Sequence, residues 1–223
     1  MSTICLDIET TGLDRVVDEI LQLSIIDENE NILYNQYFAP EWKAEWPEAM
    51  AVNHIIPEML AGKPHFKDCL PQIQSIIDSA DTIVTYNGEW FDIPMLEFKG
   101  VKFPEGYNSR DVKLLYGRYK GEWNHEKNCW KWWKLTEAAK HFKITYDAHN
   151  SLGDCIATMR VLKEIDRWET PLIPSFWHVG DRVMCPTYEK MITAMKVARE
   201  AGIDMHQETE PMMLIVKGVR KDG

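Results

Sequence analysis

Residues 3–14 read TICLDIETTGLD, a short apolar run that leads into two acids and a turn. The run over residues 3–7 predicts a buried β-strand. Because side chains alternate along a strand, Asp7 and Glu9 are predicted to lie on the same face. The turn that follows contains Gly12, which is able to take a positive φ.

Two carboxylates on one face of a strand repel each other unless a cation lies between them, because neighbouring like charges raise the pKa of one group strongly. Hard oxygen ligands of this kind suit Mg²⁺ or Mn²⁺. A lone acid–x–acid pair is still more often a solvated strand end, because acids usually lie on the surface. Asp7 and Glu9 alone therefore leave both interpretations open.

The rest of the chain predicts an α/β fold. Further strands are predicted at 19–27, 32–38 and 82–86, with a fifth that ends near Asp111. Helices are predicted at 66–79, 91–98, 112–116, 132–142 and 151–168, the last capped by Asn150 or Ser151, whereas 45–61 is helix-compatible and 117–131 is polar and irregular. Three strands followed by alternating helices and strands indicate a mixed sheet flanked by helices.

A boundary is expected near the two prolines at 171 and 174. We therefore expect one domain over residues 1–169 and a C-terminal extension over 170–223. The extension is predicted to be a small strand–helix–strand unit, with these elements at 178–185, 188–201 and 212–217.

The composition is that of an ordinary globular protein, with 45% hydrophobic and 27% charged residues. We expect no membrane partner, because no apolar run approaches the roughly 18 residues needed to cross a bilayer. The N-terminus has no basic region, so a signal peptide is not expected. The five cysteines are odd in number and lack a C-x-x-C spacing, so we expect free thiols and a cytoplasmic location.

The charge of the chain is unevenly distributed. The formal net charge is −10, which disfavours a polyanionic partner. Between Lys113 and Lys143, however, there are eight Lys and Arg residues against three Glu. This segment forms a basic island that could face nucleic acid, and bound metal would neutralise part of the acidity elsewhere.

Two further motifs follow the first one in order. Residues 87–92 read NGEWFD directly after a predicted strand, and residues 149–154 read HNSLGD at the start of a predicted helix. Together with DIETTGLD at 7–14, they resemble the three motifs of the DnaQ-like (DEDDh) 3′→5′ exonuclease family of the RNase H-like superfamily. The resemblance covers about residues 1–167 and leaves 170–223 outside it.

The resemblance implies an RNase H-like fold, with a five-stranded mixed sheet whose second strand is antiparallel. It implies that two Mg²⁺ (or Mn²⁺) ions are held by four acids, namely Asp7, Glu9, Asp92 and Asp154. Such ions clamp the attacking and leaving oxygens in phosphoryl transfer. His149 matches the general base, a task that suits an imidazole near neutral pH. A lone histidine before a helix would more often be structural, but its offset from Asp154 favours catalysis.

The resemblance also implies contacts with the terminal nucleotides. Thr10, Thr11, Gly12 and Leu13 match positions where backbone amides meet the nucleotide and an aliphatic side chain wedges against a base. His54 resembles part of an H-G-I segment, although Ile55 replaces the usual glycine, so burial of His54 is an alternative. Asn87 and Phe91 are expected to frame the same cleft, and Phe91 fits a core position equally well.

Four tryptophans, at 123, 130, 132 and 133, are interleaved with lysines at 127, 131 and 134. Aromatic rings stack on unpaired bases and lysines follow phosphates, so Trp130 and Lys131 are predicted to contact nucleic acid. Alternatively, Trp132 or Trp133 anchors the helix that follows. Asp111 is expected to support its neighbours, and Asp14 and Asp18 to be surface charges.

The sequence thus predicts a 3′→5′ exonuclease for single-stranded or frayed DNA ends, in proofreading with a separate polymerase or in DNA processing. An exoribonuclease is the alternative, since no residue identifies how the 2′-OH is treated. A non-catalytic nucleic-acid-binding module is disfavoured, because all four acids and His149 are present. The oligomeric state is not predicted.

Overall fold

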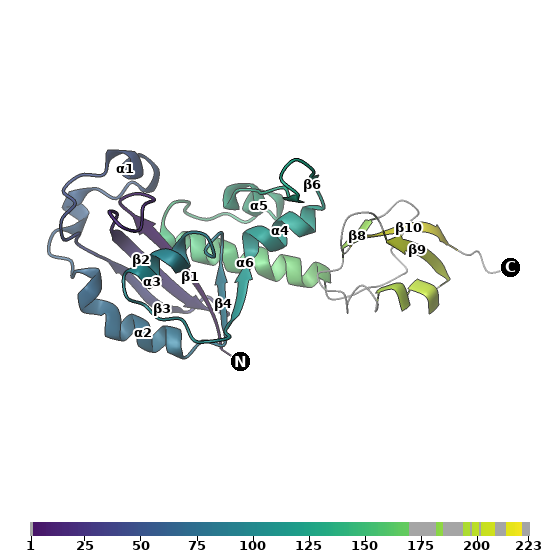
Figure 1. The fold of residues 1–223 in the computed structure, drawn as a ribbon, viewed down its shortest axis with the longest axis horizontal. Helices are drawn as coiled ribbons and strands as arrows, with labels where there is room; N and C mark the ends of the chain where they lie inside the picture. Colours follow the sequence, from purple (N-terminus) through teal and green to yellow (C-terminus); the bar gives the residue numbers. More distant parts are fainter. Residues whose placement is uncertain are drawn as a thin grey trace. The chain divides into compact units, whose positions relative to one another are not determined.

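The computed structural model describes residues 2–169, 182–184, 194–196, 198–200, 202–207 and 213–219 (Figure 1). The chain divides into two compact units. The first comprises Met1–Lys113 with Lys134–Leu162, and the second comprises Leu114–Trp133 with Lys163–Gly223. None of the helices that the structure describes combines the length and the apolar character that a membrane crossing requires.

A five-stranded sheet forms the centre of the first unit, in the order β3-β2-β1-β4-β5. Its strands are β1 (Thr3–Thr10), β2 (Ile20–Asp27), β3 (Ile32–Tyr37), β4 (Thr82–Thr85) and β5 (Asn108–Asp111). β1 pairs antiparallel with β2 and parallel with β4, while β3 is antiparallel to β2 and β5 is parallel to β4. The predicted mixed sheet with an antiparallel second strand is confirmed.

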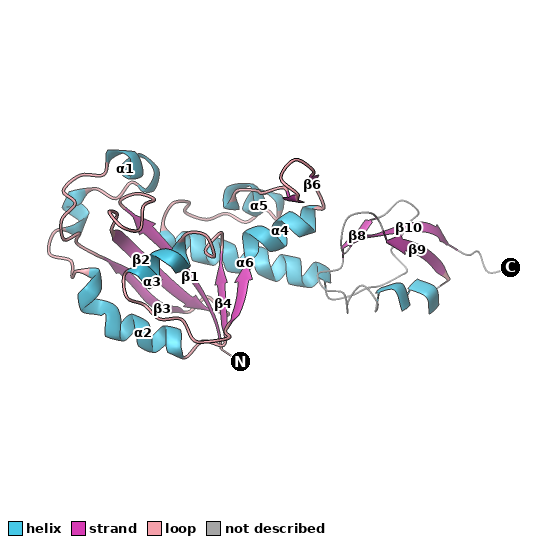
Figure 2. Cartoon of the chain, viewed as in Figure 1, coloured by secondary structure: helices cyan, strands magenta, loops and turns pink. Residues whose placement is uncertain are grey.

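The chain also forms helices, several of which lie against this sheet within the first unit (Figure 2). They are α1 (Pro47–Asn53), α2 (Leu70–Asp78), α3 (Asp92–Phe98), α4 (Val112–Lys120), α5 (Leu135–His141) and α6 (Ser151–Glu169), with 3₁₀ turns η1 (Pro57–Leu60) and η2 (Phe66–Cys69). The single helix predicted over 66–79 is therefore divided. Pro71 cannot donate a hydrogen bond and occupies the first turn of α2, so the preceding residues form the separate turn η2.

The two faces of β1 have different partners. Ile4, Leu6 and Ile8 belong to the main hydrophobic core, which also contains residues of α2 and α3. On the opposite face the Cys5 thiol donates to the Cys155 carbonyl of α6 (3.5 Å). Because side chains alternate, Asp7 and Glu9 share the face that α6 covers.

The second unit contains two small antiparallel sheets. One is a hairpin of β6 (Trp123–Asn124) and β7 (Cys129–Trp130), and the other has the order β8-β10-β9, with β8 (Arg182–Met184), β9 (Ile203–Gln207) and β10 (Met213–Val219). The prediction that 117–131 is irregular is wrong, because Trp123 and Trp130 pair across the hairpin.

The strand–helix–strand prediction for the extension omitted β9. This strand has only two buried apolar side chains, Ile203 and Met205, alternating with exposed Asp204 and His206, which is a short signal for a strand. Residues 194–196 and 198–200 are helical, within the predicted helix. The rest of that helix, the proline boundary and Cys185 lie outside the described residues.

A buried polar network attaches the start of α6 to the sheet. The Ser24 and Ser151 hydroxyls are 2.7 Å apart, and the Ser151 N–H donates to the Gln22 side chain (3.3 Å). The Asn150 side chain accepts the N–H groups of Leu152 (3.2 Å) and Gly153 (3.4 Å), which confirms it as the helix cap. This network positions the first turn of the helix that carries Asp154.

We predict that Ser24→Ala and Ser151→Ala are coupled. Each should lower the free energy of unfolding by about 1–3 kcal/mol, because each removes one half of a buried hydroxyl pair, of which the Ser24 hydroxyl also bonds to Asn35 (3.1 Å). The double variant should lose less than the sum of the two, which a double-mutant cycle in urea measures. Ser79→Ala, at an exposed serine, is the control and should change stability by less than about 0.5 kcal/mol. Additive losses would contradict the coupling.

Candidate metal centre

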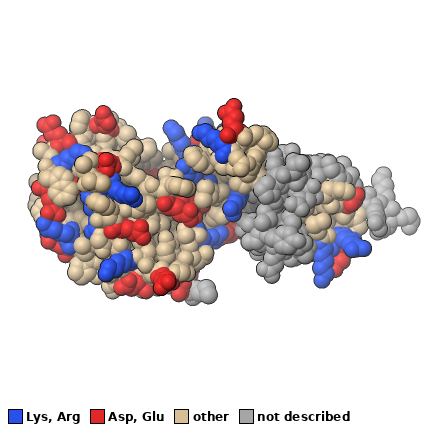
Figure 3. Space-filling model, in the orientation of Figure 1, with Lys and Arg blue, Asp and Glu red and all other residues tan. Residues whose placement is uncertain are grey.

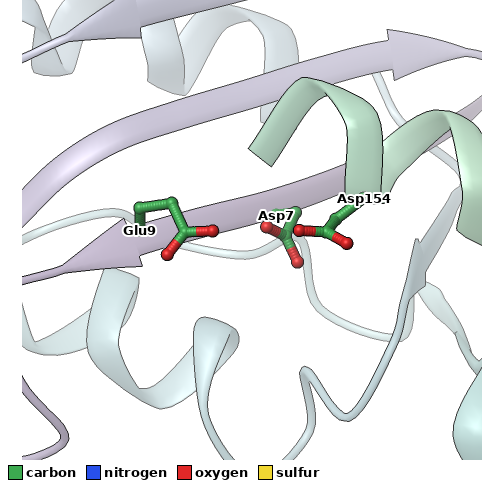
Figure 4. A group of neighbouring side chains, drawn as sticks. All are labelled: Asp7, Glu9 and Asp154. Atoms are coloured by element: carbon green, nitrogen blue, oxygen red, sulfur yellow. The ribbon is translucent and has the colours of Figure 1, made fainter. Parts of the chain in front are cut away.

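Three carboxylates meet at the end of β1. Oxygen atoms of Asp7, Glu9 and Asp154 all lie within 4.8 Å of one another (Figure 4). Asp7 and Glu9 project from β1, and Asp154 projects from the first turn of α6. This oxygen-only donor set fits Mg²⁺ or Mn²⁺.

Asp92 lies beside this group and begins α3. The pairing of β1 with β4 covers only Thr3–Cys5, so Ile8 lies beyond it, and the Ile8 N–H donates to the Asp92 carboxylate (3.1 Å). Because Ile8 stands between Asp7 and Glu9 in the chain, this bond holds Asp92 next to both acids. The structure thus brings together the four acids that the sequence singled out.

Burial and mutual repulsion disfavour the charged forms of these acids. Burial, followed by the charges of Asp92, Asp154 and Glu9, raises the pKa of Asp7 well above its usual range. Burial and the Asp154 charge raise the pKa of Glu9 to about 8, against a hydrogen bond from Asn53 that lowers it. Burial is also the main cause that raises the pKa of Asp92 and of Asp154 to about 7. A bound cation would keep the four acids ionised at neutral pH.

His149 lies in the loop before α6 and is exposed. Its φ of 62° is left-handed, and its backbone N–H donates to the Asp154 carboxylate. A Cβ at Gly153 would overlap the Asp147 carbonyl, so the loop can lie this close to the helix only because residue 153 is glycine. His54 (58°) and Asn87 (70°) are also left-handed, and strained backbone of this kind concentrates at functional sites.

The turn after β1 is held by buried side chains. Thr11 donates its hydroxyl to Asp18 (2.9 Å), which also accepts the Asp14 N–H (2.9 Å) and an ion pair from Lys43. Asp18 is buried, so the expectation of a surface charge is wrong for it, whereas Asp14 is exposed. A Cβ at Gly12 would overlap the Asp18 carboxylate. Gly12 is therefore needed for close approach and does not take a positive φ.

Two further residues of this turn that were predicted to contact nucleotides, Thr10 and Leu13, differ in exposure. Thr10 is buried, and its hydroxyl donates to the Gly12 carbonyl (2.6 Å). Leu13, in contrast, is 84% exposed. The threonines shape the turn, and Leu13 is the side chain it presents to solvent.

Glu19 holds a second segment near the turn. Its carboxylate accepts the N–H groups of Glu41 (2.5 Å), Trp42 (3.3 Å) and Lys43 (2.9 Å). Its own backbone pairs with Thr11, whose N–H donates to the Glu19 carbonyl (2.9 Å). Glu19 thus ties the turn to residues 41–43.

Asn87 is positioned by Asp111. The Asn87 N–H donates to Asp111 (2.9 Å), and its side-chain oxygen accepts the Lys113 ammonium (2.7 Å). Asp111 also accepts the Lys113 N–H (3.0 Å), which agrees with the supporting role expected of it. Phe91 is partly buried and packs against the main hydrophobic core, as the alternative prediction for this residue expected.

Two residues near the acids were missed by sequence reasoning. Asn53 is buried, donates to the Thr10 carbonyl (3.1 Å) and hydrogen-bonds to Glu9. The neighbouring His54 is exposed, so the alternative of its burial is wrong, and it ends α1 in the left-handed conformation usual for glycine. Tyr146 has a buried hydroxyl near Asp154, and burial and that carboxylate raise the pKa of the phenol. No pattern in the sequence marks Tyr146.

The mixed sheet and the acids at the end of its central strand define an RNase H-like nuclease domain. Residues 4–162 match the family model RNase_T, described as exonuclease, and the chain belongs to this DnaQ-like exonuclease family. A comparison with curated proteins found no match.

Solved exonucleases share this fold at low sequence identity. Exonuclease I of E. coli in complex with a dT13 oligonucleotide is 20% identical, with a TM-score of 0.60, over 81% of this chain and 47% of that one. Exonuclease X in complex with 5′ overhanging duplex DNA is 21% identical, with a TM-score of 0.55, over 74% of this chain and 91% of that one. This chain therefore spans less than half the length of the exonuclease I structures.

We predict that the metal-free protein becomes less stable as pH rises from about 4 to about 8. Acids whose folded-state pKa exceeds the unfolded-state value bind more protons when folded, so raising the pH through this window favours unfolding. At pH 8, Mn²⁺ should raise the Tm by roughly 5 °C or more relative to EDTA.

Differential scanning fluorimetry across this pH range tests the prediction. Asp7→Asn should stabilise the metal-free protein and weaken the response to Mn²⁺, because it removes one of the repelling charges. Asp68→Asn, at an exposed acid of η2, is the control and should change neither. A metal-free Tm that rises between pH 5 and 8 would contradict the repulsion.

Proposed function

We propose that this chain is a metal-dependent 3′→5′ exonuclease that hydrolyses phosphodiester bonds at DNA 3′ ends. The observation that carries the proposal is the group of three carboxylates within 4.8 Å, with Asp92 held beside it by the Ile8 N–H. Four acids that repel one another in a buried site are suited to bind cations, and paired divalent ions are the usual catalysts of phosphoryl transfer by nucleases.

Each residue has a proposed role in this reaction. Asp7, Glu9, Asp92 and Asp154 would hold two Mg²⁺ or Mn²⁺ ions, which supply Lewis-acid stabilisation of the phosphoryl oxygens when bound. His149 is exposed at the edge of the site and would accept the proton of the attacking water. Asn53 and the Ile8 N–H orient Glu9 and Asp92 through the bonds described above.

DNA is the favoured substrate because similar structures were determined with it. Exonuclease I of E. coli was crystallised with dA16 and dT13 oligonucleotides, and exonuclease X with duplex DNA that has a 5′ overhang. A zinc-bound complex of E. coli exonuclease I with single-stranded DNA shows a divalent metal in a protein of this fold. The proposed catalytic domain spans residues 1–169 and the proposed extension spans 170–223; the family match at 4–162 supports the first of these.

A cytoplasmic location and a proofreading or DNA-processing role complete the proposal. The free thiols of Cys5, Cys69, Cys129 and Cys155 suit a reducing compartment. Proofreading would require a separate polymerase as partner.

We also propose that the β6–β7 hairpin contacts the nucleic-acid substrate, in addition to the four acids. Trp123 and Trp130 pack edge to face, with ring centroids 4.9 Å apart, so Trp130 also stabilises the hairpin. Lys131 is exposed, although it pairs with Glu122 (3.1 Å). Figure 3 shows Lys and Arg side chains gathered where Figure 1 labels α4 and β6.

Trp132 and Trp133 differ in environment. Trp132 is 52% exposed, and the Lys127 ammonium lies 5.5 Å from its ring centroid. Trp133 packs edge-on against Tyr116 and lies under Lys131, so it serves as an anchor. We therefore add Trp132 and Lys127 to Trp130 and Lys131 as proposed contacts with an unpaired strand.

The central experiment uses 3′-labelled DNA and RNA oligonucleotides with Mg²⁺, Mn²⁺ or EDTA. We expect mononucleotide release from DNA that requires metal and disappears in Asp7→Ala. His149→Ala should bind Mn²⁺ with unchanged affinity but lose about 10²- to 10⁴-fold in kcat, because only the proton acceptor is removed. Release in EDTA, or an unchanged kcat for His149→Ala, would contradict these roles, and release from RNA alone would reassign the substrate.

Binding at several salt concentrations tests the hairpin. Lys127→Ala and Lys131→Ala should each weaken binding of a single-stranded oligonucleotide and reduce the slope of log K against log salt by about 0.7, the value for one phosphate contact. Fluorescence anisotropy in EDTA measures this without hydrolysis. Lys63→Ala, at an exposed lysine elsewhere, is the control and should leave the slope unchanged. Slopes equal to that of the unchanged protein in both variants would exclude the contact.

A further inference from the structure

The two most exposed large hydrophobic side chains of the described residues line one pocket. Leu13 is 84% exposed and Trp90 is 75% exposed. The pocket has a volume of about 480 Å³, and Phe91 and Arg15 also line it. Apolar side chains gathered in an exposed pocket indicate a binding site.

The backbone beneath both side chains is rigidly held. The Asp14 N–H, next to Leu13, donates to the buried Asp18 carboxylate (2.9 Å). The Trp90 N–H donates to the Asn87 carbonyl (3.2 Å), and Asn87 is itself bound to Asp111. The exposure of Leu13 and Trp90 is therefore built into two ordered turns.

The pocket adjoins the metal centre through the chain. Leu13 lies on the turn that follows β1, four residues after Glu9, and Phe91 immediately precedes Asp92. A substrate bound at the acids would thus have its neighbouring groups beside Trp90. Arg15 and Asp14 both line the pocket, so its lining carries one charge of each sign, and the Arg15 guanidinium is the group that suits a phosphate flanking the base.

We propose that Trp90 stacks on an unpaired nucleobase, with Leu13 against the same base and Arg15 near the adjoining phosphate. This inference rests on the proposed exonuclease function and assigns a residue that would contact the unpaired 3′ end predicted from the sequence. The family resemblance implies a base contact for Leu13 but none for Trp90. An indole ring stacks on any base, so the contact selects unpaired strands rather than a sequence.

The 3′ end of a base-paired duplex is expected to bind this pocket weakly. At a matched duplex end the terminal base exposes one face but stays paired and stacked on the other, and the penultimate base is stacked on both faces, so the end must fray before Leu13 and Trp90 can both contact one base. The enzyme should therefore act on single strands and mismatched ends faster than on matched duplex ends.

The test compares Trp90→Ala with Phe98→Ala, at an aromatic residue that is 53% exposed and lies outside this pocket. The substrates are a single-stranded DNA and two versions with an abasic residue at the terminal or the penultimate 3′ position. On the intact strand, Trp90→Ala should lower kcat/KM by about 5- to 150-fold, the range for the loss of one stacked base. Trp90→Phe should recover part of this loss, and Phe98→Ala should leave kcat/KM unchanged.

The abasic substrates identify the stacked base. At the position that Trp90 covers, removing the base should lower kcat/KM for the unchanged protein. On that substrate Trp90→Ala should lower kcat/KM very little further, because the two changes remove the same contact. An equal loss for Trp90→Ala on all three substrates, or no loss on any, would overturn the proposal. If the unchanged protein hydrolyses none of them in Mn²⁺, the exonuclease function fails instead.

Discussion

The mutual repulsion of four carboxylates is the interaction on which the rest of this structure depends. Asp7, Glu9 and Asp154 have oxygens within 4.8 Å of one another, and Asp92 is held beside them. Burial and neighbouring charges raise the pKa values of all four. Such a group is unfavourable for folding unless the scaffold holds it rigidly and a cation compensates for it.

The scaffold meets this demand with buried polar bonds. Ser24 and Ser151 join α6 to β2, which sets the position of Asp154. Asp18 and Glu19 close the turn after β1, and Asp111 holds Asn87 in its left-handed conformation. The Ser24–Ser151 and Asn87–Asp111 bonds join segments that are distant in the chain, while the bonds of Asp18 and Glu19 close one turn, and together they order the site before any ligand arrives. Such preorganisation lets binding energy serve catalysis instead of ordering the protein.

Most of the fold could be predicted, because strands and helices follow local patterns. The run before Asp7 and the alternation through Glu9 predicted the central strand and the shared face of the acids. The errors lie where the local signal is short or misleading. β9 has only two buried apolar residues, and the hairpin at Trp123 and Trp130 consists of two-residue strands. Residue type alone did not distinguish buried Asp18 from exposed Asp14.

The sequence by itself predicted the chemistry of this protein, through three motifs whose order resembles that of the DnaQ-like exonucleases. Acids at positions 7, 9, 92 and 154, with a histidine five residues before the last, indicate oxygen ligands for a metal and a proton acceptor. Only the tertiary structure decided which other side chains lie beside these acids. A left-handed turn at residue 54 leaves His54 in solvent and directs Asn53 to Glu9, while two separate turns bring Trp90 and Leu13 into one pocket. Those relations depend on backbone conformation and on contacts between distant segments, which no local pattern in the sequence encodes.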